Sequence, residues 1–178
     1  MAAGPYNQLM IKHFALVAAA VAALVSCSFE DTERAPSIDP TLLATPLVGL
    51  DNRAKTLEEF HQRALVINFW ARWCDPCRRE IPDLIAEHAR LKNEGLEIVG
   101  IAIEDDPVAV KEFAAKYGID YPVLLAKDQG FALLQGMGDT SGGLPYTVVL
   151  DRERHVRARK LGALSKQEMS AAFEAALN

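Results

Sequence analysis

The sequence has few cysteines, no low-complexity tract and no run of basic residues. Its formal net charge is −5, and its 19 lysines and arginines are scattered along the chain. A basic run that could follow a phosphate backbone is therefore missing, and we expect no nucleic-acid partner. With 178 residues, of which 50% are hydrophobic, the chain suits one globular domain once any leader is removed.

The sequence also lacks the ligand spacing of a metal site. A tetrahedral zinc site takes about four ligands, usually cysteine and histidine. The four histidines show no ligand-like spacing to any of the three cysteines. His88 falls on the apolar stripe of a predicted helix, so we expect it to be partly buried and hydrogen-bonded instead of catalytic. We expect no metal and no other cofactor.

No hydrophobic run is long enough for a comfortable membrane span. The apolar run Phe14–Val25 would be about 18 Å long as a helix, whereas the hydrocarbon core of a bilayer is roughly 30 Å thick. Lys12 and His13 precede the run, which gives the charged head and apolar middle of an export signal. We therefore expect residues 1–27 to direct export.

A cysteine directly follows this apolar run. The segment Leu24-Val25-Ser26-Cys27 resembles the lipobox of bacterial lipoproteins, in which the cysteine is acylated and becomes the first residue of the mature chain. The resemblance implies a lipid anchor on Cys27 and a location on the extracytoplasmic, periplasmic side of a membrane. Ordinary cleavage after Ser28 and an uncleaved anchor are the alternatives. The polar, proline-containing residues 28–46 are expected to be a tether, with the folded domain at 47–178.

Beyond the tether, strand-like and helix-like patterns alternate. Residues 47–50 and 54–57 flank Asp51-Asn52-Arg53, which predicts a short hairpin. Residues 64–70 are almost continuously apolar, as in a strand covered on both faces. The segments expected after them are a helix from Pro76 to about residue 91, a strand at 96–103, a helix capped by Asp106, a strand at 121–125, a short helix at 128–135, a hairpin at 145–151 and 155–160, and a helix capped by Ser165. This order favours an α/β domain with helices on both faces of a mixed sheet.

The motif Trp73-Cys74-Asp75-Pro76-Cys77 stands between the predicted buried strand and the first long helix. Unpaired backbone N–H groups and the helix dipole favour a thiolate where a helix begins. We therefore expect Cys74 to be a nucleophile that attacks a disulfide, and Cys77, one turn further on, to resolve the mixed disulfide. A structural disulfide or a zinc half-site are the alternatives for such a pair.

In this order the elements and motifs resemble the thioredoxin superfamily, and within it the exported TlpA-like and ResA-like branch that includes cytochrome c maturation reductants. The markers are the strand 66–70, the Trp73–Cys77 motif, Pro82 inside the helix, and Gly143-Leu144-Pro145 before the next strand. The resemblance implies a thioredoxin-like fold with an N-terminal hairpin and an extra strand and helix at 121–135. A monomer is expected.

The resemblance also assigns roles to residues around the dithiol. Pro145 matches the cis-proline beside the dithiol, and the backbone at Leu144 would pair with an extended substrate segment. Asn68 stands where ordinary thioredoxins have a buried aspartate, and it cannot ionise. Glu80, three residues after Cys77 and so on the same side of the helix, matches a functional glutamate of ResA-like proteins. Trp73 stands beside Cys74, and we expect it to line the docking surface.

The function favoured by this resemblance is a membrane-tethered reductant of disulfides in exported proteins. Apocytochrome c is the expected substrate, and a membrane thiol-reducing protein is the expected electron donor. The charges near the dithiol have both signs and do not set the direction of electron flow, so the direction rests on the resemblance. The alternatives are a copper-binding lipoprotein that uses the same thiolates and a peroxiredoxin-like peroxidase. Neither His155 nor Met137 stands in a recognisable copper-ligand motif.

Overall fold

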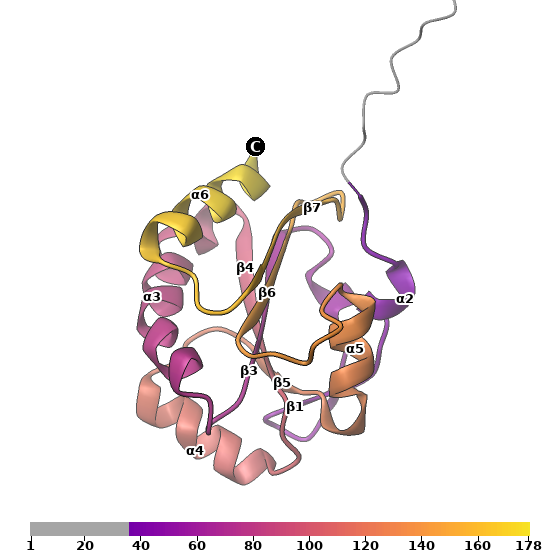
Figure 1. Cartoon of the computed structure of the whole chain (residues 1–178), viewed down its shortest axis with the longest axis vertical. Coiled ribbons are helices and arrows are strands. Elements are labelled where there is room, and N and C mark those ends of the chain that lie inside the picture. The colour runs from indigo at the N-terminus through magenta and orange to yellow at the C-terminus, as the bar shows by residue number, and fades with distance from the viewer. Residues whose placement is uncertain (1–35) are drawn as a thin grey trace, which may run out of the picture. The chain divides into compact units, whose positions relative to one another are not determined.

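The computed structural model describes residues 36–178, so the expected export signal and Cys27 lie outside the described residues (Figure 1). The described chain forms a mixed seven-stranded sheet with helices on both of its faces. The strands are β1 (Leu47–Gly49), β2 (Ala54–Lys55), β3 (Ala64–Trp70), β4 (Leu96–Ala102), β5 (Val123–Leu125), β6 (Tyr146–Leu150) and β7 (Val156–Leu161). The helices are α2 (Pro40–Leu43), α3 (Asp75–Leu91), α4 (Pro107–Tyr117), α5 (Gly130–Gly136) and α6 (Lys166–Leu177), with short 3-10 turns η2 (Leu57–Phe60), η3 (Lys92–Glu94) and η4 (Lys127–Gln129).

The strand order is β2-β1-β5-β4-β3-β6-β7. β3 pairs in parallel with β4, and β4 with β5, whereas β6 runs antiparallel to β3 and β7 antiparallel to β6. Every residue of β3 is buried, because helices cover both faces of this central strand. The continuous apolar run in the sequence predicted this strand with the bounds that the structure shows.

Two hydrophobic clusters fill the space between the sheet and its helices. Figure 1 shows α3, α4 and α6 against one face of the sheet and α2 and α5 against the other. Successive side chains of a strand point to opposite faces, so Trp70 belongs to the first cluster and Phe69 to the second. The first cluster includes Phe173 of α6, and the second includes Leu134 of α5.

Local signals for turns and helix ends are confirmed. The hairpin forms with Leu47 opposite Lys55. The Asp106 side chain caps α4, and Ser165 forms a capping box with Glu168 at the start of α6. The strand expected from residue 121 begins at Val123, and the short helix that follows is divided into η4 and α5.

The packed part of the chain begins before the boundary expected at Leu47. α2 is capped by the Asp39 side chain, and the Ile38 N–H donates to a carbonyl oxygen in the β6–β7 turn at 3.1 Å. Ile38 and Leu43 are only 3% and 5% exposed. Burial of these two apolar side chains therefore places residues 36–46 on the domain instead of in a tether. Residues 28–35 of the expected tether lie outside the described residues.

None of the helices in residues 36–178 is long and apolar enough to cross a membrane.

Candidate active site

The two cysteines of the motif lie where β3 gives way to α3. Cys74 is the N-cap residue of α3, in extended conformation, and its Sγ accepts a hydrogen bond from the Cys77 N–H at 3.3 Å. The two residues form a disulfide, with Cα atoms 5.3 Å apart. Pro76 stands in the first helical turn, where a missing N–H costs nothing. Cys74 is 4% exposed and Cys77 1%, so Cys74 is the slightly more accessible of the two.

Ion pairs hold the segment that precedes Cys74. Arg72 donates from its backbone N–H and its Nε to the Glu104 carboxylate, at 2.5 and 2.6 Å. Arg78 pairs with Asp75 and donates to the Arg72 carbonyl oxygen at 3.2 Å. Two of the arginines near the dithiol therefore have an acidic partner, which weakens their positive field at Cys74. Glu104 was missed by the sequence analysis, although its position just after β4 places it at the same end of the sheet as the dithiol.

Glu80 lies three residues after Cys77 on α3, hence on the same side of the helix, and it is only 3% exposed. Its Oε1 accepts from Asn68 Nδ2 at 2.8 Å, and its Oε2 accepts from the Leu164 N–H at 3.0 Å. Burial raises the pKa of Glu80, whereas these two hydrogen bonds act in the opposite direction. Asn68 Nδ2 also donates to Thr147 Oγ1 at 3.0 Å. The sequence indicated Glu80 and Asn68, but it carried no signal for Leu164 or Thr147.

The expected cis-proline is present, since the Leu144–Pro145 peptide bond is cis. Tyr146, the next residue, pairs with Phe69 near the end of β3, so this loop lies at the end of the sheet from which the chain continues to Cys74. Leu144 packs against the hydrophobic cluster that contains both cysteines. Trp73, next to Cys74, is 70% exposed.

Asp139 organises the loop that leads to this proline. Its Oδ1 accepts from the Ser141 N–H at 2.9 Å and from Ser141 Oγ at 2.6 Å, and Ser141 Oγ accepts from the Gly143 N–H at 3.2 Å. Hydrogen bonds from this loop lower the pKa of Asp139 and outweigh the opposing effect of burial, the largest single influence on that pKa. The ionised Asp139 carboxylate therefore holds the loop in place through its hydrogen bonds to Ser141.

His88 is a buried, hydrogen-bonded residue of α3, as expected. Its ring nitrogens contact Asp120 Oδ1 at 3.1 Å and Glu97 Oε1 at 2.9 Å. It follows Cys77 by eleven positions, which is roughly 16 Å along a helix. This histidine therefore ties α3 to its neighbours and lies away from the dithiol.

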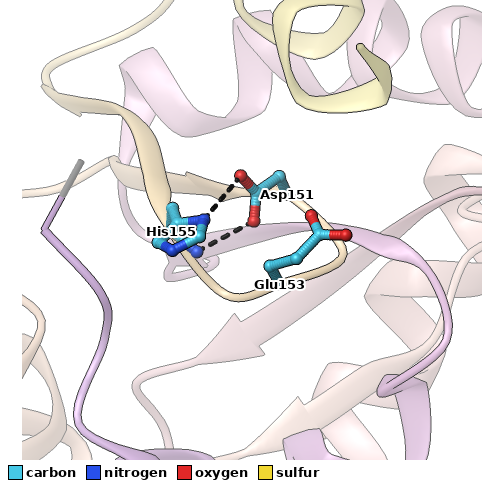
Figure 2. A group of neighbouring side chains, drawn as sticks. All are labelled: Asp151, Glu153 and His155. Atoms are coloured by element: carbon cyan, nitrogen blue, oxygen red, sulfur yellow. Dashed lines mark hydrogen bonds and ion pairs between the residues drawn. The ribbon is translucent and has the colours of Figure 1, made fainter. Parts of the chain in front are cut away.

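A second group of polar side chains lies at the turn between β6 and β7. Figure 2 shows Asp151, Glu153 and His155, whose possible ligand atoms lie within 4.8 Å of one another. Asp151 Oδ2 is 2.8 Å from an Arg157 nitrogen and 3.2 Å from His155 Nδ1, and Asp151 Oδ1 accepts from the His155 N–H at 2.9 Å. The Asp151 carboxylate already pairs with the Arg157 guanidinium and with His155, so we assign no metal ion to this group.

Known proteins resemble this chain both in sequence and in fold. Residues 30–177 match the family described as Redoxin. A "Thiol-disulfide oxidoreductase ResA" of Bacillus thuringiensis (strain Al Hakam) is 28% identical over 130 residues, which cover 73% of this chain and 71% of the relative. A protein of the same description from Geobacillus thermodenitrificans is 24% identical over 159 residues, 89% of each chain. The crystal structure of a "thiol:disulfide interchange protein, thioredoxin family protein" from Chlorobium tepidum TLS has a TM-score of 0.67 at 29% identity, and covers 82% of this chain and 96% of that chain.

Proposed function

Because the chain belongs to the redoxin family, as a TlpA-like and ResA-like thiol-disulfide oxidoreductase with a thioredoxin-like fold, we propose that it reduces protein disulfides outside the cytoplasm. The observation that carries this proposal is the Cys74–Cys77 disulfide at the start of α3, with the buried Glu80 carboxyl group one helical turn further along the same helix. A disulfide with a purely structural role would need no buried carboxyl group one helical turn away.

In the proposed reaction the reduced protein starts with two thiols. The Cys74 thiolate attacks one sulfur of a substrate disulfide, which forms a mixed disulfide and releases the first substrate thiolate. The Cys77 thiolate then attacks Cys74 Sγ, which forms the intramolecular disulfide and releases the second substrate thiolate. Two electrons pass from the dithiol to the substrate. The structure holds the oxidised protein, which a membrane thiol-reducing donor would return to the dithiol.

Glu80 is proposed to take the proton of Cys77 before the second attack. Cys77 is 1% exposed, so bulk water has little access to its thiol. The raised pKa of Glu80 brings its carboxyl group closer to the pKa of a thiol, which favours proton exchange between the two. Asn68 donates to the carboxylate at 2.8 Å and fixes its orientation.

The substrate is proposed to dock at the cis-proline loop and the exposed indole of Trp73. The backbone at Leu144 would pair with an extended segment of the substrate. We propose apocytochrome c as that substrate and a lipid on Cys27 as the membrane tether. The resemblance to the cytochrome c maturation reductants and to the lipobox supports these two assignments.

Reduction of an oxidised apocytochrome c peptide tests this function. The reduced protein should open the peptide disulfide and finish with the Cys74–Cys77 disulfide closed, as read by alkylation and mass. Cys77→Ser should trap a mixed disulfide through Cys74, and Cys74→Ser should be inactive. If Cys74→Ser instead trapped a mixed disulfide and Cys77→Ser were inactive, the assignment of Cys74 as the nucleophile would be wrong. A wild-type protein that oxidises a dithiol peptide but does not reduce the disulfide peptide would contradict the proposed direction.

A further inference from the structure

We propose that the side chains of Asn68, Trp70 and Tyr121 bind one buried water molecule next to the proton acceptor of the site. This water solvates the Glu80 carboxylate once that group has lost its proton, and Tyr121 thereby acts as a positioning residue. The role in disulfide reduction rests on the proposed function, whereas the water site itself can be tested on the oxidised protein alone.

Gly100 in β4 allows two polar side chains to meet inside the core. It pairs with Asn68 on β3, and Trp70 lies two residues further along β3, so the side chains of Asn68 and Trp70 point to the same face of the sheet. A Cβ atom on Gly100 would lie 2.7 Å from Trp70 Nε1 and 3.2 Å from Tyr121 Cε2. The indole N–H and the edge of the phenol ring therefore meet over this glycine, beside the Asn68 side chain.

The polar atoms at this place lack protein partners. Asn68 Oδ1, Trp70 Nε1 and the Tyr121 hydroxyl oxygen are buried, and none of them has a hydrogen-bond partner within residues 36–178. They are three of the five buried side-chain atoms in that part of the chain that lack one, so such atoms are concentrated here. A buried polar group without a partner costs stability, and proteins usually satisfy such groups with ordered water.

One water molecule can satisfy all three atoms and also contact the acid. Its oxygen accepts from the Trp70 N–H and from the Tyr121 O–H, and one of its hydrogens is donated to Asn68 Oδ1. Asn68 Nδ2 donates to Glu80 Oε1 at 2.8 Å, which holds the carboxyl group next to the amide. The second hydrogen of the water is therefore available to Glu80, and four hydrogen bonds are the most that a buried water usually makes.

The charges around Tyr121 keep its hydroxyl a donor. Burial, followed by the negative charges of Glu80 and Asp120, raises the pKa of Tyr121. This influence of Glu80 also agrees with the short path between the two side chains through Gly100 and Asn68. On the other side, the ring of His88 lies 5.9 Å from the Tyr121 ring between centroids, and its nitrogens contact Asp120 and a second carboxylate on β4.

The groups that contact Glu80 from other elements are neutral. They are the Asn68 amide of β3 and the N–H of Leu164, which follows β7. The titratable Cys77 thiol, one turn earlier on α3, is the group that the acid is proposed to serve. An ionised Glu80 therefore depends on neutral donors, and one further donor lowers the cost of its charge. Water held by Tyr121 should thus shift the ionisation of Glu80 toward lower pH.

Tyr121→Phe tests the water, because it removes the hydroxyl and keeps the ring. The matched control is Tyr117→Phe on α4, a half-buried tyrosine whose ring stacks on Phe113 at 4.3 Å. In the oxidised full chain, NMR cross-relaxation between water and the Trp70 indole proton detects the bound molecule. The ¹³C shift of the Glu80 carboxyl carbon follows its ionisation in the same sample.

Rates of disulfide reduction are then measured against pH for wild type, Tyr121→Phe, Glu80→Gln and the double variant. We expect the water contact of the Trp70 proton in wild type and its loss in Tyr121→Phe. The ionisation of Glu80, and the pH at which the rate rises, should move up by about one pH unit, as for loss of one hydrogen bond to a charged group. Tyr121→Phe should not change the pH profile in the Glu80→Gln background, and Tyr117→Phe should match wild type throughout.

A wild-type Trp70 indole proton without a water contact, or a Glu80 titration that Tyr121→Phe leaves unchanged, would overturn the water site. A change of the rate profile that persists in the Glu80→Gln background would overturn the positioning role, because the hydroxyl would then act on another group. If wild-type protein reduces no disulfide while the Glu80 titration responds as expected, the proposed function fails and the water site stands.

Discussion

At the residue scale, the site depends on one carboxyl group in an unusual setting. Glu80 lies in the core, and an amide side chain and a backbone N–H are its hydrogen-bond donors. Burial raises its pKa because the charged form loses the solvation of water. Neither donor carries a charge, so no ion pair offsets that loss. Glu80 therefore keeps its proton at pH values where an exposed glutamate is already ionised.

We expect Glu80→Gln to lower the rate of disulfide reduction by about 10²–10⁴-fold, because a positioned proton acceptor contributes that much. In wild type the rate should rise with pH as the carboxyl ionises above its raised pKa, and the variant should lack this rise. Stopped-flow rates between acid and neutral pH measure both effects. The control is Glu87→Gln further along α3, a half-buried carboxylate that contacts Arg90 at 2.6 Å.

The same substitution should change how stability depends on pH. A carboxyl with a raised pKa holds more protons when folded than when unfolded, so the free energy of unfolding falls as pH rises from the ordinary glutamate pKa through the raised one. Glu80→Gln should remove this fall, as urea unfolding at a series of pH values would show. An unchanged pH dependence of both rate and stability would place Glu80 outside the proton transfer.

At the scale of elements, α2 lies in a mostly polar segment of sequence and yet contributes a buried side chain to the core. The surrounding residues 36–46 include prolines and exposed polar side chains, which is why the sequence pattern favours a tether. Leu43 nevertheless enters the cluster that lies between α5 and the sheet. One buried leucine in a four-residue helix gives no periodic pattern, so only the packed structure identifies it.

We expect Leu43→Ala to lower the free energy of unfolding by about 2–5 kcal/mol, since it removes buried methyl groups and leaves a cavity. Denaturant titration of the protein measures the change. Leu161→Ala is the matched control, because the same atoms are removed from a side chain that is 51% exposed, and surface changes usually stay within about 0.5 kcal/mol. Equal effects of the two substitutions would contradict the packing of α2.

At the scale of the whole molecule, the sheet gathers the site at one of its ends. β3 and β4 run in parallel, so the dithiol after β3 and Glu104 after β4 lie at the same end of the sheet. β6 runs antiparallel to β3, so it begins at this end, directly after Pro145. The Asp151 group lies at the other end of β6. The residues proposed to contact the substrate therefore lie at one end of the sheet. The proposed membrane anchor, Cys27, lies outside the described residues.

We expect the full chain, produced in a bacterium that processes lipoproteins, to carry a diacylglyceryl group on Cys27. Mass spectrometry of the membrane-extracted protein would show this group at the new N-terminus. Cys27→Ala should lose the lipid, and alkylation before and after reduction should still differ by two thiols. A mature wild-type chain that begins after Cys27, or that keeps its leader, would contradict the anchor and leave the dithiol chemistry unaffected.

The sequence by itself determined the features that local patterns encode. The continuous apolar run marked β3, the cap residues Asp106 and Ser165 marked the starts of α4 and α6, and the Cys74 to Cys77 spacing within one helical turn marked the dithiol. Each of these depends on neighbours within a few residues. A short segment of sequence is therefore enough to read them.

Only the tertiary structure decided which distant residues meet at the site. The Leu164 N–H that donates to Glu80 is 84 residues away along the chain, and Thr147 is 79 residues from Asn68. Leu43 is buried, and Trp70 and Tyr121 meet over Gly100, because sheet pairing and helix packing bring separate segments together. Such contacts follow from the sum of many packing interactions across the domain, and no local pattern of residues records them.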